Sequence, residues 1–148
     1  MAMADRRAEA TWAGTLTEGS GALELVSSGA ASSLPITWAS RTEKADGRTS
    51  PEELLAAAHA SCYAMAFSAT LGRGGTPPES LHVTAVVSLN PKEGGGVEVT
   101  DSALTVTGTV PGLDQAGFQS AAEAGEQGCP ISNAIRNNVA ITVTATLD

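Results

Sequence analysis

Hydrophobic and polar residues alternate in several parts of the chain, and this period of two predicts β-strands. The first two alternating segments flank the turn EGSG and therefore predict a hairpin. Pro35 restricts the third to an edge or to the start of a strand. Two later segments rich in β-branched residues form a pair joined through PKEGGG, and a strictly alternating segment closes the chain. The six strands are expected within residues 8–17, 21–29, 33–40, 80–90, 95–110 and 139–147.

Helical spacing of apolar residues predicts three helices between these strands. The longest runs from Ser50 to about Leu71 and is ended by GRGGTPP. The others cover 113–127 and 130–137, and a charged loop is expected at 41–48. Strands, helix, strands, helices and a last strand predict an α+β fold in which an antiparallel sheet covers helices. We expect one domain over residues 1–148, with residues 1–9 as a flexible N-terminal tail.

Composition narrows the classes of partner. The chain has 148 residues and a net charge of −8, which argues against nucleic acid or an anionic membrane as the main partner. No apolar run approaches the roughly 20 residues that span a bilayer. The first residues lack the apolar block of a secretory signal, so the expected location is the cytoplasm. Aromatic residues make up only 3%, which makes help from a partner subunit plausible.

The start of the long helix contains one acidic residue without an evident structural role. Ser50 is a good N-cap, Pro51 fits the first helical position, and Glu53 completes a capping box with Ser50. Glu52 is then left over. From the local sequence alone it is interpreted as a solvated acid that the helix dipole favours.

Cys62 lies in the middle of this helix on an apolar stripe. The stripe consists of Leu54, Ala58, Cys62, Met65 and Ala69. On local evidence Cys62 is a small buried hydrophobic residue, inert unless a cation or hydrogen-bond donors stabilise its thiolate. His59 precedes it by three positions, about 60° around the helix, and is a candidate base.

The other cysteine, Cys129, stands directly before Pro130. Pro130 suits the first turn of a helix, so Cys129 is the expected N-cap, where backbone N–H groups favour an anion. The alternative is a cysteine that ends a loop by chance. No metal or other cofactor is expected, because His59, Cys62, His82 and Cys129 lack the paired spacing of a zinc site.

Two segments together resemble a known family. SPEELLAAAHASCYAMAFS and GCPISNAI resemble the two characteristic motifs of the OsmC/Ohr family of thiol-dependent peroxidases, and AAAHASC and CPIS are similar to its OsmC branch. The resemblance implies an α+β fold with antiparallel sheets packed around a long central helix. It also implies an intertwined homodimer with active sites between the subunits, and reduction of organic hydroperoxides to alcohols at the expense of a dithiol or small thiol.

The resemblance also assigns roles to residues. Cys62 corresponds to the cysteine that attacks the peroxide and Cys129 to the one that resolves it as a disulfide. Glu52 corresponds to the family's glutamate in PEE, and Arg41, in SRTE, to its arginine. Because the loop from Arg41 to Glu52 is about one residue longer than is usual in that branch, Arg48 is a rival for the arginine.

Two other functions compete with a peroxidase. The first is a non-enzymatic dimeric module of the same fold that binds a small apolar ligand or serves a partner protein. The second is a cysteine hydrolase that uses Cys62 and His59, for which the sequence offers no evident oxyanion loop or third residue. Joint presence of Cys62, Cys129, Glu52 and an upstream arginine favours the peroxidase.

Overall fold

The computed structural model describes residues 1–148, which divide into two compact units. The first comprises residues 1–51 and the second residues 52–148. Each unit is described by itself below.

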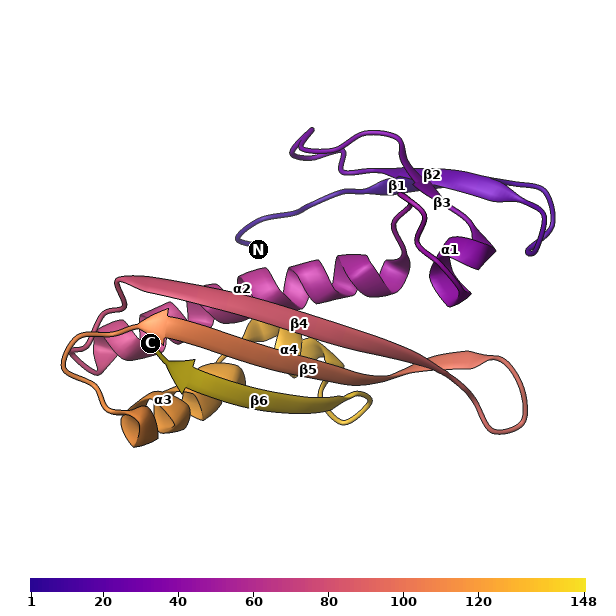
Figure 1. The fold of residues 1–148 in the computed structure, drawn as a ribbon. Coiled ribbons are helices and arrows are strands. Elements are labelled where there is room, and N and C mark those ends of the chain that lie inside the picture. Colours follow the sequence, from indigo (N-terminus) through magenta and orange to yellow (C-terminus); the bar gives the residue numbers. More distant parts are fainter. The chain divides into compact units, whose positions relative to one another are not determined.

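The first unit is a small antiparallel sheet with one short helix (Figure 1). Strands β1 (Glu9–Ala13), β2 (Ser20–Glu24) and β3 (Leu34–Ile36) lie in the order β1-β2-β3. The predicted hairpin of the first two strands is confirmed, with Glu9 opposite Glu24. Before it, Arg7 and Ser27 exchange hydrogen bonds.

The predicted third strand is too long, because its second half is a helix. Helix α1 (Trp38–Thr42) follows β3 after a single residue. Thr37 is its N-cap and forms a capping box with Ser40, in which each side chain bonds the other residue's backbone N–H. Arg41 and Thr42, expected in a loop, therefore lie in the last turn of a helix.

The second unit contains a three-stranded sheet and three helices. Its elements are α2 (Pro51–Arg73), β4 (Ser80–Pro91), β5 (Val97–Thr109), α3 (Gln115–Gln127), α4 (Pro130–Ile135) and β6 (Ala140–Leu147). All were predicted at nearly these positions. The pairing of β4 with β5 is antiparallel as expected, but β6 pairs parallel to β5. The reason is the connection: α3 and α4 form a crossover that returns the chain to run alongside β5 in the same direction.

The core of the second unit lies between this sheet and the helices, which lie on one of its faces in Figure 1. Tyr63, Phe67 and Leu71 on α2 are almost completely buried, and Phe118 and Ala122 on α3 meet them there. The rings of Phe67 and Phe118 are 5.1 Å apart between centroids. Gly125 lets α3 approach α2 closely, because a Cβ at this position would lie 3.0 Å from the Cα of Phe67.

The buried face of α2 is not the stripe predicted from the sequence. The fully buried residues are His59, Tyr63, Phe67 and Leu71, whereas Ala58, Met65 and Ala69 are exposed and Cys62 is partly buried. The helix is thus apolar on two faces. Ala58, Met65 and Ala69 of the predicted stripe face away from the core, and Cys62 lies at the core's edge. For this reason α2 is also long and apolar enough to span a membrane, contrary to expectation; its contacts identify it as the core helix of this unit.

Candidate functional site

The fold brings the two cysteines together. Cys62 lies in the middle of α2, and Cys129 is the N-cap of α4. Their side chains share a hydrogen bond, and both are free thiols. Cys129 is completely buried, whereas Cys62 is partly exposed. Residues far apart in the sequence therefore form a pair of adjacent thiols, which their spacing did not reveal.

The entrance of α4 interacts with Cys62 rather than with Cys129. The predicted N-cap position of Cys129 is confirmed, but its side chain makes no capping hydrogen bond. Burial raises the pKa of the Cys62 thiol, a backbone N–H hydrogen bond from Ile131 opposes that rise, and the contact with Cys129 adds to it. On balance the pKa of Cys62 lies above its usual value. Full activation of this thiol requires a further positive charge or donor.

Cys62 opens onto a cavity of about 270 Å³ within the second unit. One wall is the exposed face of α2, and the other is the turn between α3 and α4. The lining residues are Cys62, Met65, Ala66, Ala69, Arg73, Gly128 and Pro130. The predicted apolar stripe thus forms a wall of the cavity in front of the thiol. A small molecule with an alkyl group fits this lining better than a purely polar one.

His59 does not act as a base for Cys62. Its Nδ1 lies 2.6 Å from Oγ of Ser102, and its Nε2 lies 2.8 Å from Oγ of Ser132. Both ring nitrogens are therefore occupied, and the ring is completely buried. Burial lowers the pKa of His59, and the charge of Glu126 partly opposes this shift. The hydrolase interpretation, which needs His59 to face the sulfur, is wrong.

The surroundings of Glu52, Arg41 and Arg48 differ. Glu52, in the first turn of α2, is 8% exposed, so its interpretation as a solvated acid is wrong. In the first unit, the guanidinium of Arg41 lies 5.8 Å from the centroid of the Trp38 ring, a cation–π contact. Arg48 is exposed and pairs with Asp46 at 3.3 Å. Because Arg41 and Glu52 belong to different units, their pairing stays a prediction.

Arg41 also borders an apolar cavity of about 290 Å³ inside the first unit. Its lining includes the side chains of Trp12, Leu16, Ile36 and Trp38. Trp12 and Leu16 are substantially exposed for residues of their size. A guanidinium at the edge of such a cavity suits a ligand that has both an apolar and a polar end.

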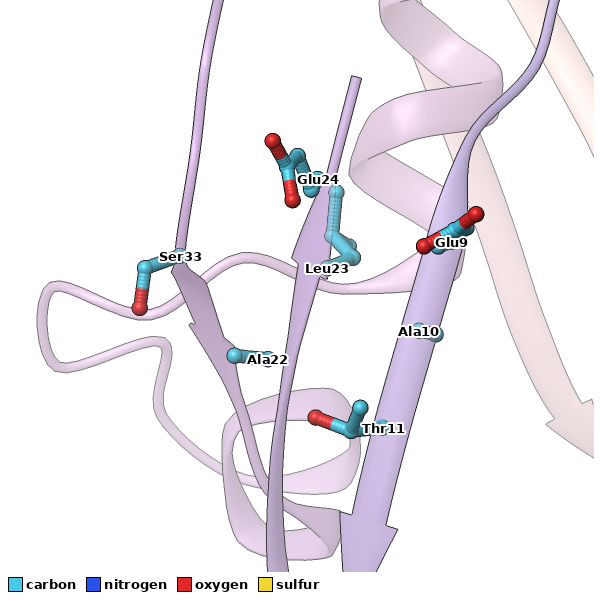
Figure 2. A pocket seen from close by; sticks show the side chains of 7 residues that line it. All are labelled: Glu9, Ala10, Thr11, Ala22, Leu23, Glu24 and Ser33. Atoms are coloured by element: carbon cyan, nitrogen blue, oxygen red, sulfur yellow. The ribbon is translucent and has the colours of Figure 1, made fainter. Parts of the chain in front are cut away.

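A different cavity of the first unit has no comparable chemistry. It measures about 210 Å³ and is lined by residues of β1 and β2 and by Ser33, just before β3; Glu9 and Glu24 are among them (Figure 2). The others are Ala10, Thr11, Ala22 and Leu23, so no nucleophilic thiol and no cation lines it. No cluster of three or more His, Cys, Asp or Glu side chains suited to a metal ion occurs in the structure.

Sequence reasoning missed three residues around the thiols. Ser102 and Ser132 bind His59, and the backbone N–H of Ile131 bonds Cys62. Ser132 stands in the motif CPIS, three residues after Cys129, so the sequence alone places it near that thiol. Ser102 is the one serine of β5, among four threonines, and no sequence signal marks it as a partner of His59.

The chain is similar to known proteins over most of its length. Residues 43–144 match the family model described as OsmC-like protein. The chain is 35% identical to peroxiredoxin OsmC of Escherichia coli over 136 residues, which cover 92% of the chain and 93% of that protein. It is 32% identical to the organic hydroperoxide resistance protein of Xanthomonas axonopodis pv. citri over 97 residues, 65% of the chain and 66% of that protein.

Solved structures show the same fold. An organic hydroperoxide resistance protein OsmC from Legionella pneumophila superposes with a TM-score of 0.75 at 25% identity, covering 99% of both chains. An organic hydroperoxide resistance protein from Elizabethkingia anophelis gives a TM-score of 0.75 at 23% identity, covering 99% of this chain and 100% of that one. The predicted α+β architecture with its long helix is therefore confirmed.

Proposed function

The chain belongs to the OsmC-like family, and from this premise we propose that it is a thiol-dependent peroxidase that reduces organic hydroperoxides to alcohols. One observation carries the proposal: Cys62 faces a mostly apolar cavity while its sulfur contacts the thiol of Cys129. The names of the relatives, peroxiredoxin OsmC and organic hydroperoxide resistance protein, support the same activity.

The proposed cycle begins at Cys62. Its thiolate attacks the terminal oxygen of the hydroperoxide, the O–O bond breaks, and the alkoxide leaves as the alcohol after it takes up a proton. Cys62 is thereby oxidised to a sulfenic acid. The sulfur of Cys129 then attacks that of Cys62, water leaves, and a disulfide forms. An external dithiol or small thiol supplies two electrons and two protons and restores both thiols by exchange.

Arg41 is the proposed cation of the site. Burial raises the pKa of Cys62, and a guanidinium next to the sulfur would lower it. The same group would stabilise the charge that develops on the departing oxygen. Glu52, buried although it is a carboxylate, is proposed to orient that guanidinium through a bidentate pair. It cannot act on Cys62 directly along the helix, since ten residues span about 15 Å.

Organic hydroperoxides are the proposed substrates. Met65, Ala66 and Ala69 line the cavity in front of Cys62, and aromatic and aliphatic side chains line the one beside Arg41. Apolar walls favour an alkyl hydroperoxide over hydrogen peroxide because burial of its hydrocarbon part contributes binding energy.

A homodimer is the proposed assembly, with the sites between subunits and each chain acting as one domain in the cytoplasm. The exposed face of α2 supports association, because Met65 is 68% exposed and its neighbours Ala58 and Ala69 are exposed as well. Exposed apolar side chains gathered along one helix face are typical of an interaction surface.

Counting thiols tests the cycle. Free thiols per chain are measured before and after one equivalent of cumene hydroperoxide, in the wild type and in Cys129→Ser. We expect both thiols to disappear in the wild type. In Cys129→Ser the remaining thiol should be lost and a sulfenic acid should be trapped by dimedone. Two unchanged thiols in the wild type would refute the enzyme and leave a dimeric ligand-binding module as the explanation.

A further inference from the structure

His59 joins three elements of the second unit inside its core. The ring stands on α2, one turn before Cys62, and bonds Ser102 on β5 through Nδ1 and Ser132 on α4 through Nε2. The ring and both serines are 0% exposed. Buried polar groups that bond only one another fix relative positions, because any displacement leaves them unsatisfied.

The start of α4 supplies the two hydrogen-bonding contacts of Cys62. Cys129 precedes its first residue, the N–H of Ile131 bonds the sulfur of Cys62, and Ser132 follows immediately. A helix of six residues has little stability of its own. Its position therefore depends on its contacts. Cys129 and Ile131 pack against the core, Ser132 bonds His59, and at the other end Arg136 pairs with Glu126 at 2.8 Å.

We propose that His59 is a positioning residue for the thiol pair: through Ser132 it holds α4 so that the N–H of Ile131 stays on the sulfur of Cys62 and Cys129 stays beside it. This inference rests on the proposed role of Cys62 as the attacking thiol. The hydrogen bonds of His59 go to the two serines and not to a sulfur, so the proposed effect runs through α4. The bond to Ser102 anchors the ring to the sheet, but it does not reach the thiols.

The charge state of the ring fits this role. Burial lowers the pKa of His59, so the ring is neutral at neutral pH, with one nitrogen donating and the other accepting. The charged group that acts on it is the carboxylate of Glu126 on α3, which is itself paired with Arg136 from the end of α4. Tyr63, one turn further along α2, donates its hydroxyl to the carbonyl of Ala122 instead.

Two serine substitutions separate positioning from mere stability. Ser132→Ala and Ser102→Ala each remove one hydrogen bond from the same buried imidazole, so both should lower the urea midpoint by similar amounts. Only Ser132 lies on α4.

In a Cys129→Ser background, which leaves one thiol, the rate of Cys62 alkylation by iodoacetamide is measured against pH. We expect Ser132→Ala to raise the apparent pKa of Cys62 and to slow alkylation at pH 7 roughly 2- to 10-fold, the range for one hydrogen bond. Ser102→Ala should leave both unchanged.

Replacing the ring itself gives an independent check. The terminal amide of Gln lies near the position of Nε2, whereas the shorter amide of Asn lies near that of Nδ1. His59→Gln should therefore keep the bond to Ser132 and the alkylation profile of Cys62, and His59→Asn should behave like Ser132→Ala. This pair decides the matter if Ser132→Ala does not fold.

The outcomes are distinct from those that test the peroxidase. Equal alkylation profiles for Ser132→Ala and Ser102→Ala, or an unchanged profile in His59→Asn, would overturn the positioning role. The alkylation readout measures the thiol itself, so it remains valid even if Cys62 reduces no peroxide.

Discussion

The backbone N–H of Ile131 hydrogen-bonds the sulfur of Cys62, although the residue at the N-cap position of this helix is Cys129. This donor in the first turn of α4 therefore serves the thiol on α2. This arrangement gives each cysteine a separate task. Cys62 gains a donor and an opening to a cavity, while Cys129 is completely buried beside it, where it contacts the sulfur it is proposed to attack.

Arg41→Gln is expected to impair the enzyme far more than Arg48→Gln. The hydrogen bond from Ile131 does not cancel the effect of burial on the pKa of Cys62, so a guanidinium has a role to fill. We expect Arg41→Gln to lower kcat/KM for cumene hydroperoxide roughly 10²- to 10³-fold, as for loss of one transition-state donor. Arg48, exposed and paired with Asp46, should stay within about twofold of the wild type. The reverse ranking would make Arg48 the arginine of the site.

Local rules predicted most of the second unit, because its signals are local. Pro130 after Cys129 predicted where α4 starts, and GRGGTPP predicted where α2 ends to within two residues. Helix α1 was missed because its capping box uses Ser40 in place of Glu or Gln, directly after a strand of three residues. Alternation of Pro35, Thr37 and Ala39 with apolar residues then resembled a longer strand.

The site itself was only partly predictable. Helix α2 has apolar residues on two faces, many of them alanine, and periodicity cannot tell which of the two faces meets the core. The stripe containing Met65 was therefore assigned to the core, where Tyr63 and Phe67 actually lie. Contact between Cys62 and Cys129 is a tertiary contact that no spacing rule encodes. The family resemblance proposed it, and the fold brings the two thiols together.

Gly125→Ala should destabilise the second unit even though alanine favours helices. A Cβ at Gly125 would stand 3.0 Å from the Cα of Phe67 and 3.2 Å from its Cβ, so α3 would have to move away from α2. We expect a net loss of about 1–2 kcal/mol in the free energy of unfolding, after subtraction of the gain in helix propensity. Urea denaturation measures it.

Gly72→Ala is the matched control. Gly72 also lies in a helix, and a Cβ there would meet nothing within 4 Å. Only the gain in helix propensity then remains, and it should raise the free energy of unfolding by up to about 1 kcal/mol. If both substitutions changed stability in the same direction, the close approach of α3 and α2 at Gly125 would not be a constraint.

Stability should decrease as the pH falls below about 6.5, and His59 should contribute to the decrease. Burial lowers the pKa of His59 in the folded state from its ordinary value of 6.5. Below that pH the unfolded chain binds a proton that the folded chain does not, so the free energy of unfolding falls by up to about 1.4 kcal/mol per pH unit. The loss continues until the folded-state pKa is reached. Urea denaturation between pH 5 and 8 should show a shallower dependence in His59→Gln, and identical slopes would contradict the prediction.

Met65→Lys is expected to weaken the proposed homodimer. The side chain of Met65 is 68% exposed on the face of α2 that is turned away from the core, so the substitution should cost little in a folded single chain. At an interface it would bury an ammonium group without a partner, which is strongly unfavourable. Light scattering after size exclusion should give twice the mass of one chain for the wild type and a shift toward one chain for the variant.

Val86→Lys is the matched control. Val86 on β4 is 57% exposed and lies outside that face of α2, so this substitution should leave the mass unchanged. A wild type with the mass of one chain would refute the dimer, and a Met65→Lys variant with the mass of two would place its interface elsewhere.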